Sequence, residues 1–149
     1  MYDENIMKLT LDISKTSKDP SAKVCAIITN LDNEILSVGV NKIKENIIES
    51  ELDYIFTKKE IKKYACEHAE IVALKNLKPT DKELNLYLNY PPCLQCAVEL
   101  VLNKNVNFKN LFYIDIGSNT FRERYKTFEA HCLFSHRNVN IHQIDEGSI

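Results

Sequence analysis

The sequence contains few of the residues that divide a chain into separate units. Only three of its 149 residues are glycine and four are proline, and it has no Gly/Ser-rich linker and no internal repeat. A chain of this length suits one domain, which buries roughly 70% of the surface that the unfolded chain exposes. We therefore expect residues 1–149 to form a single domain.

Long apolar runs and an excess of one charge are also missing. No apolar run approaches the ~20 residues that cross a bilayer, and no basic segment precedes an apolar stretch at the start of the chain. We expect no signal peptide, no membrane partner and a cytoplasmic location. The 19 basic and 21 acidic side chains give a net charge of −2, which argues against a protein that binds nucleic acid through a broad basic face.

The cysteines do not have the pattern of a disulfide framework. Their number, five, is odd, and they lack the dense, even spacing of small disulfide-rich domains. Without an export signal we expect reduced thiols. The close pair Cys93 and Cys96 then indicates metal binding or catalysis, whereas Cys132 is expected in the core on the apolar face of a helix.

Hydrophobic periodicity predicts alternating helices and strands. The sequence predicts helices over about 6–13, 94–103 and 121–132, strands over 24–29, 34–40, 84–88, 111–116 and 139–144, and mostly loop over 42 to about 58. A further helix is predicted after this loop, with Ile71, Leu74 and Leu77 on one face and its end near Pro79. A hairpin comes first and strand–helix alternation follows, and strands joined through a helix lie parallel. This order predicts the α/β class, as a three-layer α/β/α sandwich with a mixed five-stranded sheet.

Two short motifs place metal-ligating side chains at the predicted starts of two helices. One is His68-Ala69-Glu70, and the other, at a strand-to-helix turn, is Pro92-Cys93-Leu94-Gln95-Cys96. A catalytic zinc ion takes three protein ligands and leaves a fourth position for water. The start of a helix favours thiolates, because its free backbone N–H groups and the positive end of the helix dipole stabilise a negative charge there. The motifs therefore predict a Zn²⁺ site with His68, Cys93 and Cys96 as ligands.

Glu70 is the predicted catalytic residue. It lies two positions after His68, about 200° away around a helix, and so is poorly placed to be a ligand on the same side. Near the helix start it can still reach a zinc-activated water. A carboxylate there can take a proton from the water and pass it to the substrate.

Three other interpretations of the motifs remain open. Cys-x-x-Cys alone can be a redox pair, although such a pair has no use for the upstream His-x-Glu. A closed structural zinc site needs a fourth ligand, which Cys66, Cys25 or His131 could provide. His-Ala-Glu alone is also an ordinary segment of a solvated helix.

Together the motifs resemble the His-x-Glu and Pro-Cys-x-x-Cys signature of the zinc nucleobase deaminases. Nearly the whole chain is similar to the cytidine and deoxycytidylate deaminase superfamily, most of all to the deoxycytidylate (dCMP) deaminase branch. The segments that carry this resemblance are Ser17-Lys18-Asp19-Pro20-Ser21, Gly39-Val40-Asn41, Leu86 to Ala97 and Phe121 to Asp145. The resemblance implies a cytidine deaminase-like fold, Zn²⁺, conversion of dCMP to dUMP and ammonia, and a homo-oligomer.

The resemblance also implies substrate contacts. Asn41 matches an asparagine that contacts the nucleotide sugar in the family. Tyr90, just before the zinc turn, is a candidate for contact with the base and can equally be a packed core tyrosine. Cations expected near a nucleotide phosphate are Lys42, Lys44, Arg122 and Arg124, each of which can equally be a solvated surface charge. His131, His136 and His142 are interpreted as structural or exposed.

Several positions depart from the family pattern. Cys25 stands where the branch has glycine, and Lys42-Ile43-Lys44 replaces the usual Gly-x-Pro after Asn41. Ile71-Val72-Ala73 follows His-Ala-Glu, which resembles tRNA adenosine and guanine deaminases more than dCMP deaminases. A deaminase of tRNA adenosine, guanine or cytidine therefore remains an alternative, as does a non-catalytic zinc module.

Overall fold

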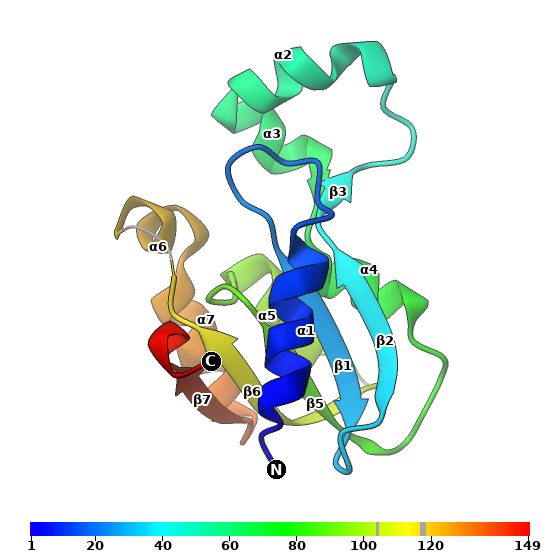
Figure 1. Cartoon of the computed structure of the whole chain (residues 1–149), viewed down its shortest axis with the longest axis vertical. Helices are drawn as coiled ribbons and strands as arrows, with labels where there is room; N and C mark the ends of the chain where they lie inside the picture. Colours follow the sequence, from blue (N-terminus) through cyan, green and yellow to red (C-terminus); the bar gives the residue numbers. More distant parts are fainter. Residues whose placement is uncertain (104, 117–118) are drawn as a thin grey trace.

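A mixed five-stranded sheet forms the centre of the computed structural model, which describes residues 1–103, 105–116 and 119–149 (Figure 1). The strand order is β2-β1-β5-β6-β7. The strands are β1 (Cys25–Asn30), β2 (Ile35–Val40), β5 (Glu83–Leu88), β6 (Asn107–Ile114) and β7 (Asn140–Ile144). The predicted strands therefore all exist, with ends shifted by a few residues.

The directions of the strands follow from their connections. β1 pairs antiparallel with both β2 and β5, and the β1–β2 pair is the predicted hairpin. β5, β6 and β7 pair in parallel, because helices cross over between them. Helix α5 (Leu94–Val101) joins β5 to β6, while α6 (Asn119–Tyr125) and α7 (Thr127–His136) lie between β6 and β7.

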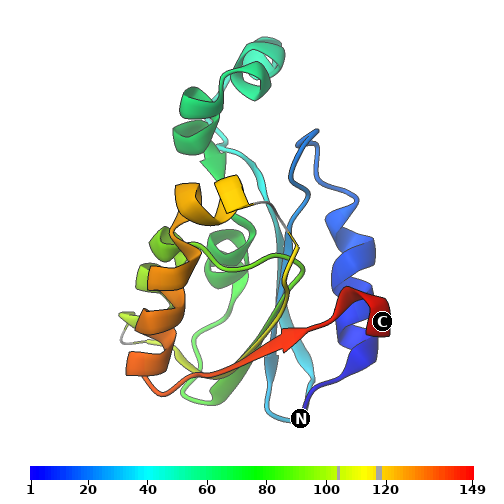
Figure 2. The ribbon, with the colours of Figure 1, turned by 90° about the vertical axis from the view of Figure 1, so that its left-hand side faces the viewer.

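Helices cover both faces of the sheet (Figure 2). Helix α1 (Glu4–Ser14) packs on one face, and α4 (Ala69–Asn76), α5 and α7 pack on the other. This arrangement confirms the predicted α/β/α sandwich with a mixed sheet. Within the described part of the chain, no helix has both the length and the apolar character needed to span a membrane.

Alternation along the strands divides the core into two layers. In β1, Cys25 and Ile27 face α1, whereas Ala26 and Ile28 face the helices on the opposite side. All six residues of β1 are buried because the strand lies inside the sheet and both its faces are covered. Strand β5, next to β1, leads into the turn that begins α5.

A glycine allows α4 to lie directly against β2. A Cβ atom at Gly39 would lie 2.3 Å from the carbonyl oxygen of Ala69 and 2.3 Å from the nitrogen of Ala73. Real side chains do not approach backbone atoms so closely, so this position requires glycine. The close approach brings the first turn of α4, which carries Glu70, against the end of the sheet.

Residues 42–67 form a projecting arm that leaves the sandwich and returns to it (Figures 1 and 2). The arm consists of β3 (Lys42–Ile43), η1 (Glu49–Glu51), α2 (Leu52–Thr57), α3 (Lys59–Ala65) and β4 (Cys66–Glu67), and its two short strands pair antiparallel as a stem. The prediction of mostly loop over 42–58 is therefore wrong for α2. The helix predicted next, with His68 near its start, is α4, and α3 comes before it as a separate helix. Because α2 and α3 each bury a single residue, they show little apolar periodicity.

The helix predicted across residues 121–132 is two helices. Lys126 has a φ of 53° and separates α6 from α7, which changes the face that the following residues bury. In α7 the buried residues are Thr127, Ala130 and Phe134. Phe128 is consequently 75% exposed, and the prediction of Cys132 in the core is wrong because this thiol is exposed.

Candidate metal centre and catalytic pocket

The three predicted zinc ligands come from the starts of two helices. His68 is the N-cap residue of α4, and Cys93 is the N-cap residue of α5. The Cys93 sulfur accepts a hydrogen bond from the backbone N–H of Cys96, which satisfies one of the free donors at the start of α5. Both helices therefore direct their positive ends toward the same place.

The ligand atoms lie at distances that fit a zinc ion. His68 Nδ1 is 3.2 Å from Cys96 Sγ and 3.3 Å from Cys93 Sγ, and the three atoms all lie within 4.8 Å of one another. Tetrahedral zinc, with bonds of about 2.0–2.1 Å to nitrogen and 2.3 Å to sulfur, separates such ligands by about 3.5 Å. The structure thus brings together the residues that the sequence selects, and they fit a tetrahedral metal.

The alternative of a closed structural site finds no fourth ligand. Among the residues that the structure describes, the metal-binding group holds His68, Cys93 and Cys96 alone. Cys25 lies in the other core layer, against α1, and the His131 ring packs on Tyr113 with centroids 5.3 Å apart. Cys66 lines the adjacent cavity without joining the group. This three-residue set leaves a coordination position for water, as catalytic zinc requires.

Glu70 is a buried acid beside the ligand atoms. Its side chain, in the first turn of α4, is 5% exposed and hydrogen-bonded to Cys96. Burial, followed by the charge of Cys93, raises the pKa of Glu70 to about 7. A carboxyl group in this environment can both accept and release a proton near neutral pH.

The thiols and the imidazole interact closely. The hydrogen bond from Cys96 is the largest cause that lowers the pKa of Cys93, to about 5, and the same bond raises the pKa of Cys96. Burial alone lowers the pKa of His68, but its hydrogen bond to Cys93 and the charge of that thiolate raise it to about 9. The lowered pKa of Cys93 favours its thiolate, which is the form that binds a metal ion.

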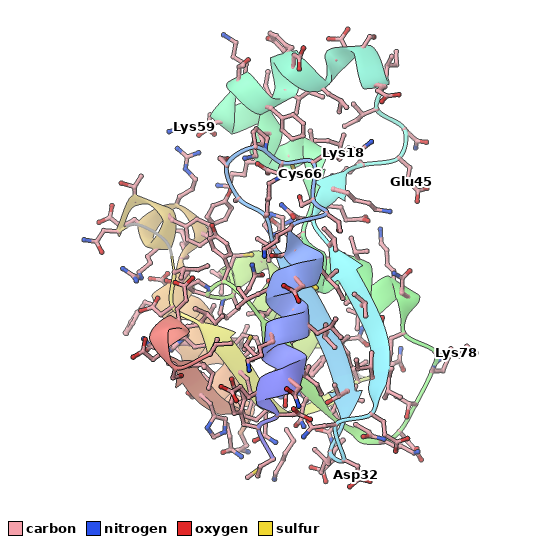
Figure 3. The ribbon with its side chains drawn as sticks, in the orientation of Figure 1. Lys18, Asp32, Glu45, Lys59, Cys66 and Lys78 are labelled. Atoms are coloured by element: carbon pink, nitrogen blue, oxygen red, sulfur yellow. The ribbon has the colours of Figure 1, made fainter. Side chains whose placement is uncertain are left out.

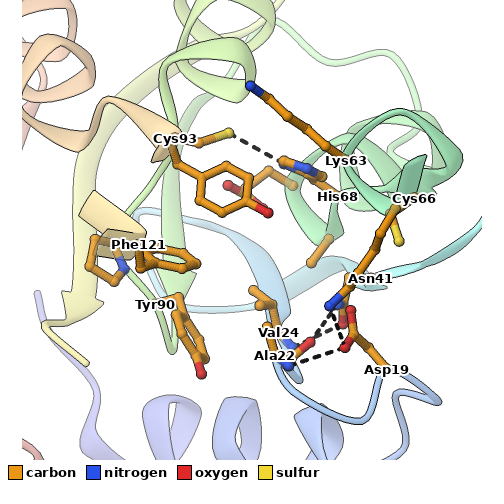
Figure 4. Close-up of a pocket in the computed structure, with 15 residues that line it drawn as sticks. Asp19, Ala22, Val24, Asn41, Lys63, Cys66, His68, Tyr90, Cys93 and Phe121 are labelled. Atoms are coloured by element: carbon orange, nitrogen blue, oxygen red, sulfur yellow. Dashed lines mark hydrogen bonds and ion pairs between the residues drawn. The ribbon is translucent and has the colours of Figure 1, made fainter. Parts of the chain in front are cut away.

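A cavity opens beside the ligand atoms, with an aromatic wall on one side (Figure 4). The rings of Tyr90 and Phe121 have centroids 5.3 Å apart, and those of Phe121 and Tyr125 are 4.7 Å apart. Tyr125 also meets the ring of His68 edge-on at 5.8 Å. The structure places Tyr90 in the cavity, as expected. Sequence reasoning assigned Phe121 and Tyr125 to a packing face, because it missed the break at Lys126.

Asn41 lines the opposite side of the cavity (Figure 4) and also holds the entry to β1. Its side-chain oxygen accepts a hydrogen bond from Val24 N–H at 2.9 Å, and its side-chain nitrogen donates to the Ala22 carbonyl at 2.7 Å. Asn89 binds the neighbouring backbone groups of Lys23 and Cys25 in the same way, at 2.9 and 2.8 Å. The two asparagines thereby fix the segment that supplies Ala22 and Val24 to the pocket.

Sequence reasoning missed a buried ion pair at the edge of the cavity. Asp19 Oδ1 is 2.8 Å from Lys62 Nζ, with both side chains largely buried. Burial opposes the charge of Asp19, but hydrogen bonds from Lys62 and from the backbone of Ser21 and Ala22 more than offset it and lower its pKa. The pair joins the projecting arm to the loop before β1. It spans 43 positions, so no local pattern could have revealed it.

Three of the four candidate phosphate cations either are neutralised or line a cavity that meets the catalytic one at Asp19, Asn41 and Cys66, away from its aromatic wall. Lys42 forms an ion pair with Glu45 at 3.5 Å and, with Lys44, lines a different cavity beneath the projecting arm. Arg122 pairs with Asp115 at 2.8 Å. Arg124 is different, because the cavity that it lines shares the aromatic wall of Tyr90, Phe121 and Tyr125 with the catalytic cavity.

Comparisons with known proteins agree with this site. The family described as the cytidine and deoxycytidylate deaminase zinc-binding region matches residues 1–109. Human deoxycytidylate deaminase is 33% identical over 101 residues, which cover 64% of this chain and 56% of the human protein. The mouse protein of the same name is 29% identical over 138 residues, which cover 89% of this chain and 74% of that protein.

Solved structures share the fold. The dCMP deaminase of cyanophage S-TIM5, in complex with dCMP and dUMP, superposes with a TM-score of 0.68 at 17% identity over 97% of this chain and all of that one. RibD of Acinetobacter baumannii gives a TM-score of 0.64 at 16% identity over 93% of this chain and 34% of that one. The family match covers the His-x-Glu motif and the Cys-x-x-Cys motif, whose side chains meet in the pocket. On these grounds the chain belongs to the cytidine and deoxycytidylate deaminase family of zinc-binding proteins.

Proposed function

We propose that the protein is a zinc-dependent hydrolase that converts dCMP and water to dUMP and ammonia. The observation that carries this proposal is the buried Glu70 carboxyl beside three zinc-ligand atoms at the starts of two helices. The deoxycytidylate deaminases of human and mouse, which this chain resembles, support the choice of a cytosine nucleotide. Residues 1–149 are proposed to act as a single deaminase-type domain.

The chain supplies both the metal ligands and the proton carrier. His68, Cys93 and Cys96 would hold the zinc ion, which when bound activates water for attack on the base. Glu70 takes a proton from the attacking water and delivers it to the ring nitrogen of cytosine. It then carries a second proton to the amino group, which leaves as ammonia. Burial of Glu70 supports this role, because a carboxyl with a raised pKa exchanges protons readily near pH 7.

The two sides of the cavity suggest how the nucleoside is held. Tyr90, with Phe121 beside it, offers a ring face to the base, and Asn41 is the proposed sugar contact. Asn41 uses one oxygen lone pair and one N–H on the backbone of residues 22 and 24. Among the described residues its second lone pair and second N–H have no partner and remain for a ligand. Fixed by those bonds, Asn41 would meet the sugar in one orientation.

The protein is further proposed to be a cytoplasmic homo-oligomer. All five cysteines are free, and Cys93 and Cys96 must stay reduced to bind zinc, which suits a reducing compartment. Measurement of molar mass in solution tests the assembly. A purely monomeric protein at micromolar concentration would contradict it.

The substrate assignment is tested by release of ammonia from a panel of substrates. The panel is dCMP, CMP, cytidine, cytosine, guanine and a tRNA anticodon stem, each at one pH and ionic strength. We expect dCMP to have the highest kcat/KM and deoxycytidine, measured in parallel, to be much poorer. Equal use of nucleoside and nucleotide would overturn the dCMP assignment. Absence of ammonia from every substrate would instead favour a non-catalytic zinc module.

A further inference from the structure

A second cavity adjoins the catalytic pocket on the outer side of its aromatic wall. The two cavities share Ala22, Lys62, Tyr90, Phe121 and Tyr125. The second cavity adds Ser21 from the loop before β1, Lys59 from the start of α3, and Thr120 and Arg124 from α6. A molecule that extends from the zinc site past Tyr90 therefore enters a space lined by cations and hydroxyl groups.

The charges of this second cavity are not balanced. Lys62 is neutralised by Asp19 and also hydrogen-bonds the Ser21 hydroxyl at 2.7 Å. Within the described residues, neither Lys59 nor Arg124 forms an ion pair, and no acidic side chain lines the second cavity. Two positive charges thus remain available to a ligand.

We propose that Lys59 and Arg124 bind the 5′-phosphate of the substrate, an inference that rests on the proposed deamination of a nucleotide. A phosphate monoester carries a charge of about −1.5 to −2 at pH 7, which two unpaired cations match. Arginine can also bind two phosphate oxygens at once. A phosphodiester carries a single charge, so the match favours a mononucleotide over the backbone of a nucleic acid.

The two cations come from different parts of the molecule. Lys59 lies on the projecting arm (Figure 3), whereas Arg124 lies on α6, beside the sandwich. The stem of the arm runs directly into the zinc ligand His68, because β4 ends at Glu67. A bound phosphate would therefore bridge the arm and the sandwich, while the base lies at the metal. Selection of nucleotide over nucleoside is thus assigned to the arm.

The experiment compares Lys59→Gln and Arg124→Gln with the wild-type protein, using dCMP and deoxycytidine as substrates. A hydrogen bond to a charged group is worth about 10- to 150-fold in binding, so each substitution should lower kcat/KM for dCMP by a factor in that range. Most of the loss should appear in KM, and kcat/KM for deoxycytidine should not change. Lys59→Arg keeps the charge and should retain much of the activity on dCMP.

Lys44→Gln is the matched control, since Lys44 forms no ion pair within the described residues and lines a cavity that does not include the aromatic wall. It should leave kcat/KM for dCMP unchanged. An equal loss in Lys44→Gln and Lys59→Gln would overturn the proposal, because the effect would then come from net charge. Equal losses on dCMP and deoxycytidine would also overturn it. So would a larger loss on cytosine in single-stranded DNA than on dCMP, which would assign the cations to a polynucleotide backbone.

A binding measurement separates this inference from the proposed function. Titration calorimetry with dCMP and with deoxycytidine reports the phosphate contact whether or not turnover occurs. If both Gln variants bind dCMP more weakly than wild type but wild type releases no ammonia, the phosphate site is supported and the proposed function is overturned. If wild type releases ammonia from dCMP while both Gln variants bind dCMP as tightly as wild type, the proposed function is supported and the phosphate site is overturned.

Discussion

The metal centre and the projecting arm are built in opposite ways. The ligands of the metal centre and Glu70 come from the first turns of two helices that pack on a buried sheet. The arm lies outside the sandwich, and several of its large apolar side chains, among them Ile48, Tyr54 and Tyr64, are exposed. A buried helix start holds metal ligands and a proton carrier in fixed positions, as metal-dependent catalysis requires. In our proposal, recognition of the phosphate involves the arm.

The comparison also indicates which changes the protein can tolerate. Well-packed buried positions lose stability when their volume changes, whereas exposed positions away from special features change it little. Substitutions of the metal ligands should therefore affect stability, zinc binding and turnover together. Substitutions at exposed positions of the arm should change stability little.

The largest effect is expected from removal of a zinc ligand. Cys93→Ser should lose the metal and with it all measurable deamination, and the midpoint of thermal unfolding should fall because the ion joins α4 to α5. Zinc content by elemental analysis and thermal unfolding check this. Cys132→Ser, which changes an exposed thiol, is the control and should keep zinc and stability. Activity retained in a zinc-free Cys93→Ser protein would contradict the prediction.

The substitution Gly39→Ala should lower the free energy of unfolding by about 3 kcal/mol, which is the upper end of the usual cost of overpacking a core. In Gly39→Ala the new Cβ would lie 2.3 Å from two backbone atoms of α4, so the helix that carries Glu70 must shift. Gly147→Ala is the control, because its Cβ would have only an ordinary 3.5 Å contact with Asp145. Chemical denaturation measures the free energy of unfolding. Equal stabilities of the two variants would show that α4 does not need this close approach.

Loss of the ion pair between the arm and the sandwich should have a smaller effect on the free energy of unfolding. Asp19→Asn should destabilise the fold by about 2 kcal/mol near pH 7, typical of hydrogen bonds to charged groups. Because folding lowers the pKa of Asp19, its contribution is complete above the ordinary Asp pKa and disappears as the pH falls through the lowered value. The stability difference from wild type should therefore shrink in acid. Asp32→Asn, at an exposed position, is the control, and a difference that grows in acid would contradict the assignment.

The smallest effect is expected on the outer surface of the arm. Tyr64 is 71% exposed, so Tyr64→Ser should change the free energy of unfolding by no more than about 0.5 kcal/mol. Phe134→Ala, in the core beneath α7, should cost about 3–5 kcal/mol. If Tyr64→Ser proved as costly as Phe134→Ala, the arm would have to be packed against something, such as a second copy of the chain.

The metal centre was predictable because the residues of each of its two motifs lie close together in the sequence. His68 and Glu70 lie within three residues of each other, Cys93 and Cys96 within four, and each motif opens a helix. The sandwich was predictable for a similar reason, since its strands are short apolar runs separated by helices. The roles of Asn41 and Tyr90 stay predictions, although the structure places both in the catalytic cavity.

What sequence reasoning missed depends on distant contacts or on a single backbone angle. The Asp19–Lys62 pair joins residues 43 positions apart, and α2 buries too little to show a period. The left-handed Lys126 turned one predicted helix into two, and so moved Phe121 and Tyr125 from the core to the pocket wall. The sequence alone does not distinguish Arg124 from Arg122, because only the structure shows that Asp115 neutralises Arg122.

Turnover of dCMP by Glu70→Gln tests the central claim most directly. The variant should fold and bind one zinc ion per chain as wild type does, since Glu70 is not a ligand. An amide cannot carry the proton, so kcat should fall by about 10²–10⁴-fold or more, whereas wild type should release one dUMP and one ammonia for each dCMP. A zinc-loaded Glu70→Gln protein that turns over dCMP at nearly the wild-type kcat would contradict the account.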